Sequence, residues 1–199
     1  MPNDERQRSG GTRRFGELPV EEMDSAQRAV NDRLVGYLYP DRAGSGAAIG
    51  GPMTALLRSP ELADAVGRLV PLMFEGLSVP RAATEVTILL TARHWDCDFE
   101  FHTHRKYAAR YGVEDAVVEA IANDVKPELG DELADTYDFV ARLLREGDVD
   151  DATFASVERR WGRQGAIELV TTVGFYTMLA LVLNVDHYPA PELPARARK

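Results

Sequence analysis

The chain has 199 residues, of which 45% are hydrophobic and 28% are charged, a composition typical of a globular protein with one sizeable core. Its formal net charge of -9 disfavours nucleic acid and anionic membranes as partners, because both are bound through clustered Lys and Arg. Cys97 is the single cysteine, which excludes an intrachain disulfide, and the N-terminal residues lack the apolar segment of a signal peptide, so we expect a cytoplasmic protein.

The N-terminal part of the chain predicts an arm followed by helices. Residues 1–16 are rich in Arg, Gly, Asn and Ser without apolar periodicity, which predicts a flexible arm. Residues 20–38 predict the first helix, and a Gly-rich loop follows over residues 41–52. This loop lacks the Lys-Ser or Lys-Thr pair of a phosphate-binding loop. Ser59 as N-cap and Pro60 as first helical residue predict that the next helix begins there and continues through residue 73.

The rest of the chain also predicts helices. Pro80 opens one, and Asp96 is expected to cap another over residues 97–111, with Gly112 ending it. Further helices are expected over residues 113–123, 131–145, 153–161 and 164–185, and residues 188–199 are expected to form a tail. No run of alternating β-branched residues indicates a strand. The sequence therefore predicts an all-α fold with a single domain at residues 17–187.

The most apolar segment, residues 167–185, is nearly long enough to cross a membrane. Glu168, Asn184 and the interruption at Gly174 make it a poor lipid-facing helix. We therefore expect it to be the buried central helix of the domain.

Three residues with chemically active side chains are expected to share one helix. Cys97, Glu100 and His104 have the i, i+3, i+7 spacing that places side chains on one helical face. Glu85 lies on the preceding helix and can reach the same pocket if the chain turns between residues 93 and 97. Two carboxylates and an imidazole in a half-buried pocket suit proton transfer. The alternative is a solvated helical face with an incidental ion pair.

The segment from Glu85 to His104, with the sequence EVTILLTARHWDCDFEFHTH, resembles the carboxymuconolactone decarboxylase and alkylhydroperoxidase D superfamily. Residues 57–63 and 168–176 resemble decarboxylase-like members, so the similarity covers roughly residues 51–185. The hydroperoxidase branch has a Glu, then a Cys-x-x-Cys pair, then a His. Glu85, Cys97 and His104 match that pattern, whereas Glu100 stands in place of the second Cys. A dithiol peroxidase cycle needs that resolving thiol, so the resemblance implies the decarboxylase-like branch.

The resemblance implies a helical bundle that assembles as a homo-oligomer, either a trimer or a hexamer. It implies an acid–base enzyme without a cofactor, a decarboxylase of a small carboxylated or lactone-type molecule. In this hypothesis His104 is the general acid, Glu100 orients it, Glu85 relays protons and Cys97 is a polar pocket wall. Two alternatives remain open: a peroxidase that uses Cys97 with an external thiol, and a non-catalytic ligand-binding protein on the same scaffold. The sequence does not name the substrate.

Other residues are weaker candidates for the site. Arg93 is a candidate anchor for a substrate carboxylate, with an ion pair at the surface as the alternative, and Trp95 and Tyr176 are candidate pocket residues, with packing roles as the alternative. We expect no metal site. His102 and His104 face different sides of a helix, and the set of His94, Glu100 and His104 has no recognised ligand spacing.

Overall fold

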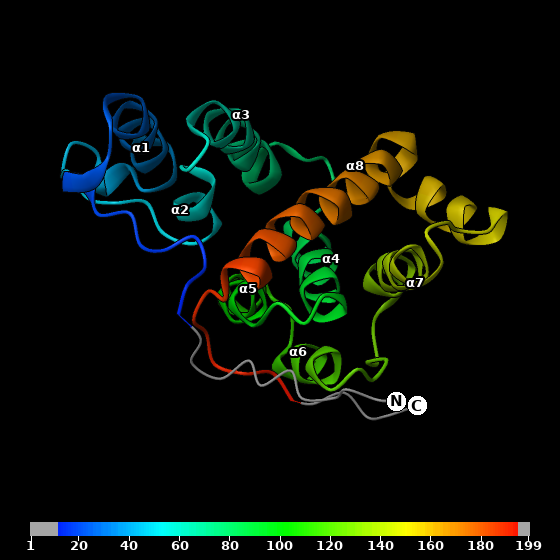
Figure 1. The fold of residues 1–199 in the computed structure, drawn as a ribbon. Helices are drawn as coiled ribbons and strands as arrows, with labels where there is room; N and C mark the ends of the chain where they lie inside the picture. The colour runs from blue at the N-terminus through cyan, green and yellow to red at the C-terminus, as the bar shows by residue number, and fades with distance from the viewer. Residues whose placement is uncertain (1–11, 195–199) are drawn as a thin grey trace.

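The computed structural model describes residues 12–194, and these form a bundle of eight α-helices without a strand (Figure 1). The prediction of an all-α fold is confirmed. The helices are α1 (Ser25–Leu38), α2 (Pro52–Leu56), α3 (Pro60–Pro71), α4 (Arg81–His94), α5 (Asp98–Arg110), α6 (Asp115–Ala122), α7 (Asp131–Glu146) and α8 (Asp151–Asp186). Two 3-10 turns, η1 (Val20–Glu22) and η2 (Pro40–Arg42), and a π-helical turn, η3 (Leu72–Gly76), join the first helices.

Helix α4 lies at the centre of the bundle, where it contacts α5, α6, α7 and α8. Every residue from 83 to 93 is buried, so no face of this helix is left to solvent. The hydroxyls of Thr87 and Thr91 donate to the carbonyls one turn earlier, at 2.9 and 2.8 Å, which satisfies them inside the core. The packing on all sides of helix α4 therefore fixes the positions of the polar side chains that it carries.

Helix α8 crosses the bundle from one end to the other (Figure 1). Asp150 caps it by accepting from the Thr153 backbone N–H at 2.7 Å, and Gly162, with a φ of 69°, divides it into two segments as predicted. The helix is long and apolar enough to cross a membrane, and half of its most apolar window is buried inside the bundle. The core helix of a soluble protein meets the same criterion of length and hydropathy. The inward face of α8 is buried, as expected for a core helix.

Two predicted helix starts are wrong, each because a local hydrogen bond or backbone geometry decides the boundary. Helix α1 begins at Ser25 because Asp24 and Gln27 form a reciprocal capping box, with hydrogen bonds of 2.8 and 3.0 Å. Helix α5 begins at Asp98 with Cys97 at the N-cap position. Asp96, the predicted cap, instead has a left-handed φ of 49° in the turn before it.

The predicted flexible arm is only partly covered by the structure, since residues 1–11 lie outside the described residues. Where it is described, it is fixed to the C-terminal end of α8. The Arg13 guanidinium pairs with the buried Asp186 carboxylate at 2.6 Å, and the Phe15 N–H donates to the same carboxylate at 2.8 Å. Arg13 also stacks on the ring of Tyr188. Residues 13–15 therefore contact a buried acidic partner far along the chain, which composition does not reveal.

Candidate functional site

Helices α4 and α5 are joined by a tight turn that brings Glu85 and His104 together. The Cys97 N–H donates to the Ala92 carbonyl at 2.8 Å, which closes the turn and packs α5 alongside α4. Glu85 comes from the first turns of α4, while Glu100 and His104 come from α5. The expectation that the chain turns between residues 93 and 97 is confirmed.

The centre of the site is a hydrogen bond between His104 and Glu85. The His104 Nδ1 atom lies 2.8 Å from the Glu85 Oε2 atom, and the Glu85 side chain is 0% exposed. A carboxylate accepting from Nδ1–H fixes the ring orientation and leaves Nε2 as the nitrogen that can exchange a proton. The pair therefore has the geometry of a carboxylate–imidazole dyad.

Arg81 compensates the buried charge of Glu85. It lies one turn earlier on α4, with its Nη2 atom 2.5 Å from the Glu85 Oε1 atom. Its Nη1 atom donates to the carbonyls of Met73 and Phe74 at 2.8 and 3.0 Å. A buried carboxylate is costly without such a partner, so Arg81 both stabilises Glu85 and anchors η3 against α4.

Aromatic rings enclose the His104 imidazole. The ring centroids of Phe74, Tyr107 and Tyr176 lie 6.0, 5.6 and 5.0 Å from that of His104. The guanidinium of Arg81 stacks on Phe74 at 4.3 Å from the ring centroid. These contacts exclude water from the pair, which strengthens electrostatic interactions inside the site.

Glu100 lies one turn before His104 and is 3% exposed, but the hydrogen bond to the imidazole comes from Glu85. The hypothesis that Glu100 orients His104 is therefore wrong. Burial raises the pKa of the Glu100 carboxyl well above its ordinary value. Its Oε2 atom is buried without a hydrogen-bond partner among residues 12–194.

Tyr176 from α8 completes the set, as the sequence suggested. Its side chain is buried and contacts the edge of the His104 ring. Burial raises the pKa of Tyr176 well above its ordinary value, and the negative charges of Glu100 and Glu85 raise it further. The phenol is therefore a neutral hydrogen-bonding group close to both carboxyls.

Cys97 occupies different surroundings. It is 1% exposed and packs with Ala180 and Leu183, and with the partly buried rings of Trp95, Phe99 and Tyr188. The prediction that Cys97 lies within the same helix as Glu100 and His104 is wrong, because Cys97 is the N-cap residue, with φ and ψ of -91° and 90°. The helical spacing therefore does not apply to it.

Arg93 and Trp95 also lie at the α4–α5 turn. Arg93 pairs with Asp96 at 3.2 Å, so the ion-pair alternative is confirmed, although only Asp96 lies at the surface: the side chains are 4% and 41% exposed. The Trp95 indole N–H donates to the Thr177 hydroxyl at 3.0 Å, and Asn184 donates to the Trp95 carbonyl at 2.7 Å. Arg93 is about two helical turns along α4 from Glu85. These contacts favour a role for Arg93 and Trp95 in fixing the turn.

Three residues of the site were missed by the sequence reasoning: Arg81, Phe74 and Tyr107. Tyr107 could have been found, because it follows His104 by three positions on a helix. Arg81 could have been found, because it precedes Glu85 by four positions, a spacing that pairs opposite charges on a helix. Phe74 could not, since it lies in a π-helical turn just beyond residue 73, where the expected helix ended. Such turns are rare and concentrate at functional sites.

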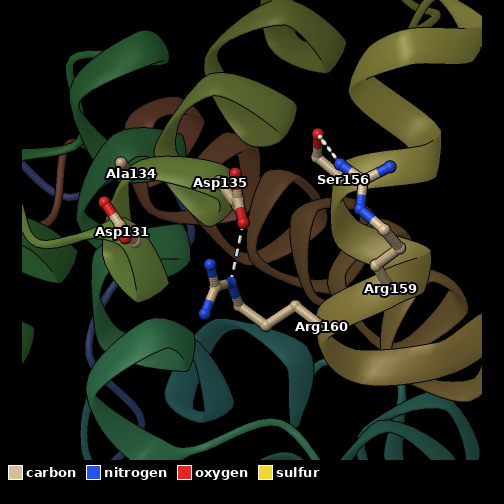
Figure 2. Close-up of a pocket in the computed structure, with 6 residues that line it drawn as sticks. All are labelled: Asp131, Ala134, Asp135, Ser156, Arg159 and Arg160. Atoms are coloured by element: carbon tan, nitrogen blue, oxygen red, sulfur yellow. Dashed lines mark hydrogen bonds and ion pairs between the residues drawn. The ribbon is translucent and has the colours of Figure 1, made fainter.

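A separate polar groove of about 410 Å³ lies between α7 and α8 (Figure 2). Two hydrogen bonds lie within the groove: Arg160 donates to Asp135 at 2.7 Å, and Arg159 donates to the Ser156 hydroxyl at 3.0 Å. Asp131 and Ala134 complete the lining. The groove shares no residue with the Glu85–His104 site.

The described part of the chain holds no group of three or more His, Cys, Asp or Glu side chains arranged to bind a metal ion. The chain was also compared with known proteins. Neither the models of known protein families nor the curated protein sequences gave a match to it.

Proposed function

We propose that this protein is an acid–base enzyme that needs no cofactor, in which His104 transfers a proton to a small organic substrate. The observation that carries the proposal is the buried hydrogen bond between His104 and Glu85, balanced by Arg81. Imidazole exchanges protons near neutral pH, and a fixed carboxylate on Nδ1 stabilises the positive charge that the ring carries as an acid. A structural core seldom needs three buried ionisable groups in contact, because a well-packed apolar set stabilises as well.

Decarboxylation of a carboxylated or lactone-type molecule is the reaction that we favour. The bond to the carboxylate breaks, carbon dioxide leaves, and the electron pair stays on the substrate, which then takes a proton from His104. A site enclosed by Phe74, Tyr107 and Tyr176 assists this step, because removing water destabilises a carboxylate more than neutral carbon dioxide. The resemblance of residues 57–63 and 168–176 to decarboxylase-like proteins is the second support for this choice.

A peroxidase that uses Cys97 is disfavoured by its surroundings. The reactive form of cysteine is the thiolate, which needs an electropositive and partly exposed setting. Cys97 is 1% exposed in an apolar cluster, and the chain has no second cysteine to resolve an oxidised thiol.

We also propose that the chain forms a homo-oligomer, a trimer or a hexamer. Helix α8 exposes an apolar stripe that includes Ile167, which is 60% exposed, together with Val170, Leu181 and Val185. Exposed apolar stripes of this kind are typical of association surfaces. Light scattering at micromolar concentration tests the proposal, and a monomer mass would contradict it.

The catalytic proposal is tested by screening the purified protein with small organic acids and carboxylated lactones for the release of carbon dioxide. The His104→Ala variant should lose about 10²–10⁴-fold in rate, the usual contribution of a general acid. The matched control is His102→Ala, which removes the same side chain from another face of α5 and should keep the wild-type rate. Unchanged turnover in His104→Ala would refute the proposal. Stoichiometric ligand binding without turnover would instead favour a binding protein.

A further inference from the structure

Glu100 is a buried carboxyl to which the proposed function gives no role. It is 3% exposed, and its Oε2 atom has no hydrogen-bond partner among residues 12–194. No cation pairs with it in that part of the chain, since the guanidinium of Arg81 contacts Glu85 and the η3 carbonyls. A buried polar atom without a partner needs an explanation, because leaving one costs about 1–3 kcal/mol.

The groups around Glu100 disfavour its charged form. Glu85 on α4 already supplies one buried carboxylate, and only Arg81 balances it. Tyr176 on α8 contributes a neutral phenol, and His104 follows one turn later on α5. A second carboxylate in this enclosed space would be desolvated and repelled, and burial indeed raises the pKa of Glu100 well above its ordinary value.

We propose that Glu100 is a second catalytic acid, which donates a hydrogen bond and then its proton to the substrate oxygen that takes up negative charge as carbon dioxide leaves. The inference rests on the proposed function and adds the substrate class to it. A carboxylic acid can donate in this way only if it keeps its proton. The unpartnered Oε2 atom is then the atom that a bound substrate contacts.

The steps balance with His104 as the other acid. The carbon–carbon bond breaks, its electron pair forms a new carbon–carbon double bond, and the substrate carbonyl oxygen takes the Glu100 proton to give an enol. His104 then protonates carbon at the position left by carbon dioxide, and the enol oxygen returns its proton to Glu100. Overall, the substrate loses one carbon dioxide and gains one proton, which His104 takes from solvent.

The mechanism restricts the substrate. An oxygen can accept the electron pair only if its carbonyl is conjugated with the carbon that loses the carboxylate. The site is therefore expected to act on β-oxo acids and their vinylogous relatives, including unsaturated lactones. Saturated acids without such a carbonyl should not react.

A substrate-free experiment tests the protonation of Glu100. Infrared spectra of the wild-type protein and Glu100→Gln at neutral pH should differ by the carbonyl band of a protonated carboxylic acid. Glu146→Gln, which removes an exposed carboxylate paired with Arg142 and Arg145, is the matched control and should show no such band. Absence of the band from the Glu100 difference spectrum overturns the inference.

The catalytic role is tested by turnover and its pH dependence. The turnover of acetoacetate is compared with that of butyrate, and the turnover of unsaturated lactone acids with that of their saturated counterparts. Glu100→Leu should lower kcat by about 10²–10⁴-fold, and Glu100→Gln by less, because an amide can donate a hydrogen bond but no proton. The mechanism needs the protons of both Glu100 and His104, so the logarithm of the wild-type rate should fall with alkaline pH at a slope approaching about two, and that of Glu100→Gln at a slope of about one. A purely structural Glu100 would not produce that difference.

The outcomes separate the two proposals. Turnover of saturated acids, or an alkaline slope that is the same in wild type and Glu100→Gln, overturns the role of Glu100 while the role of His104 stands. Failure of wild-type protein to act on any oxo acid or lactone also overturns it. A rate that is insensitive to His104→Ala overturns the proposed function itself.

Discussion

The two ends of the contact between α4 and α5 differ in the side chains that surround a buried polar group. At one end, Glu85 is surrounded by partners of opposite or complementary charge, Arg81 and His104. At the other end, beside the turn, Cys97 packs against Ala180 and Leu183. Glu85 and Cys97 are both buried, but Glu85 contacts a guanidinium and an imidazole, whereas Cys97 packs in an apolar cluster. Burial alone therefore does not identify a reactive residue, and the surrounding side chains decide what it can do.

The largest expected difference between the two ends is in the reaction rate. Glu85→Gln should lower turnover by about 10²–10⁴-fold, because an amide can hold the His104 ring in the wrong tautomer. Cys97→Ala should leave turnover close to the wild-type value. Initial rates of carbon dioxide release measure both. The reverse ranking would show that the chemistry belongs to the thiol end.

The next difference is in stability. Glu85→Ala leaves the Arg81 guanidinium buried without its partner, so the free energy of unfolding should fall by about 3–5 kcal/mol. Urea unfolding followed by circular dichroism measures the change. The control is Arg68→Ala, which breaks a solvent-exposed pair with Asp64 and should cost less than about 1 kcal/mol. Equal losses in the two variants would contradict the burial of charge at Glu85.

The third expected effect depends on pH and isolates Glu100. Burial raises its folded-state pKa above the unfolded value, so stability is fully present below the ordinary glutamate pKa. Stability is then lost as pH rises toward the folded-state pKa, by up to about 1.4 kcal/mol per pH unit. The glutamine of Glu100→Gln cannot ionise, so the free energy of unfolding of this variant should rise relative to wild type over that pH window. Urea unfolding of both proteins across the window measures the difference, and a constant difference would show that Glu100 does not titrate as a buried acid.

The sequence predicted most of the helices because their signals are local. Gly112 and Gly147 take left-handed conformations where helices α5 and α7 end, and Gly162 divides α8 where the pattern changes. The start of α1 was misplaced because the capping box of Asp24 and Gln27 was not recognised. Such signals need only a few neighbouring residues, so they can be read without a structure.

The sequence predicted some members of the site, Glu85, Glu100, His104 and Tyr176, but not how they pair. Spacing placed Glu100 and His104 on one helix, but which carboxyl reaches His104 depends on how α4 and α5 pack. Phe74 reaches the site from η3, the π-helical turn that follows α3. Tertiary packing determines these contacts, and the local pattern of the chain does not contain it.

The smallest expected effect is at Cys97. A buried thiol in an apolar cluster behaves as a small hydrophobic side chain, so Cys97→Ala should lower the free energy of unfolding by about 1 kcal/mol through lost packing. The same burial predicts that a thiol reagent modifies the native protein slowly and the urea-unfolded protein at once. A time course of modification at several urea concentrations measures this directly, because the rate should follow the opening of the α4–α5 turn. Rapid modification of the native protein would place Cys97 in contact with solvent, and the contrast between the two ends of α4 and α5 would then fail.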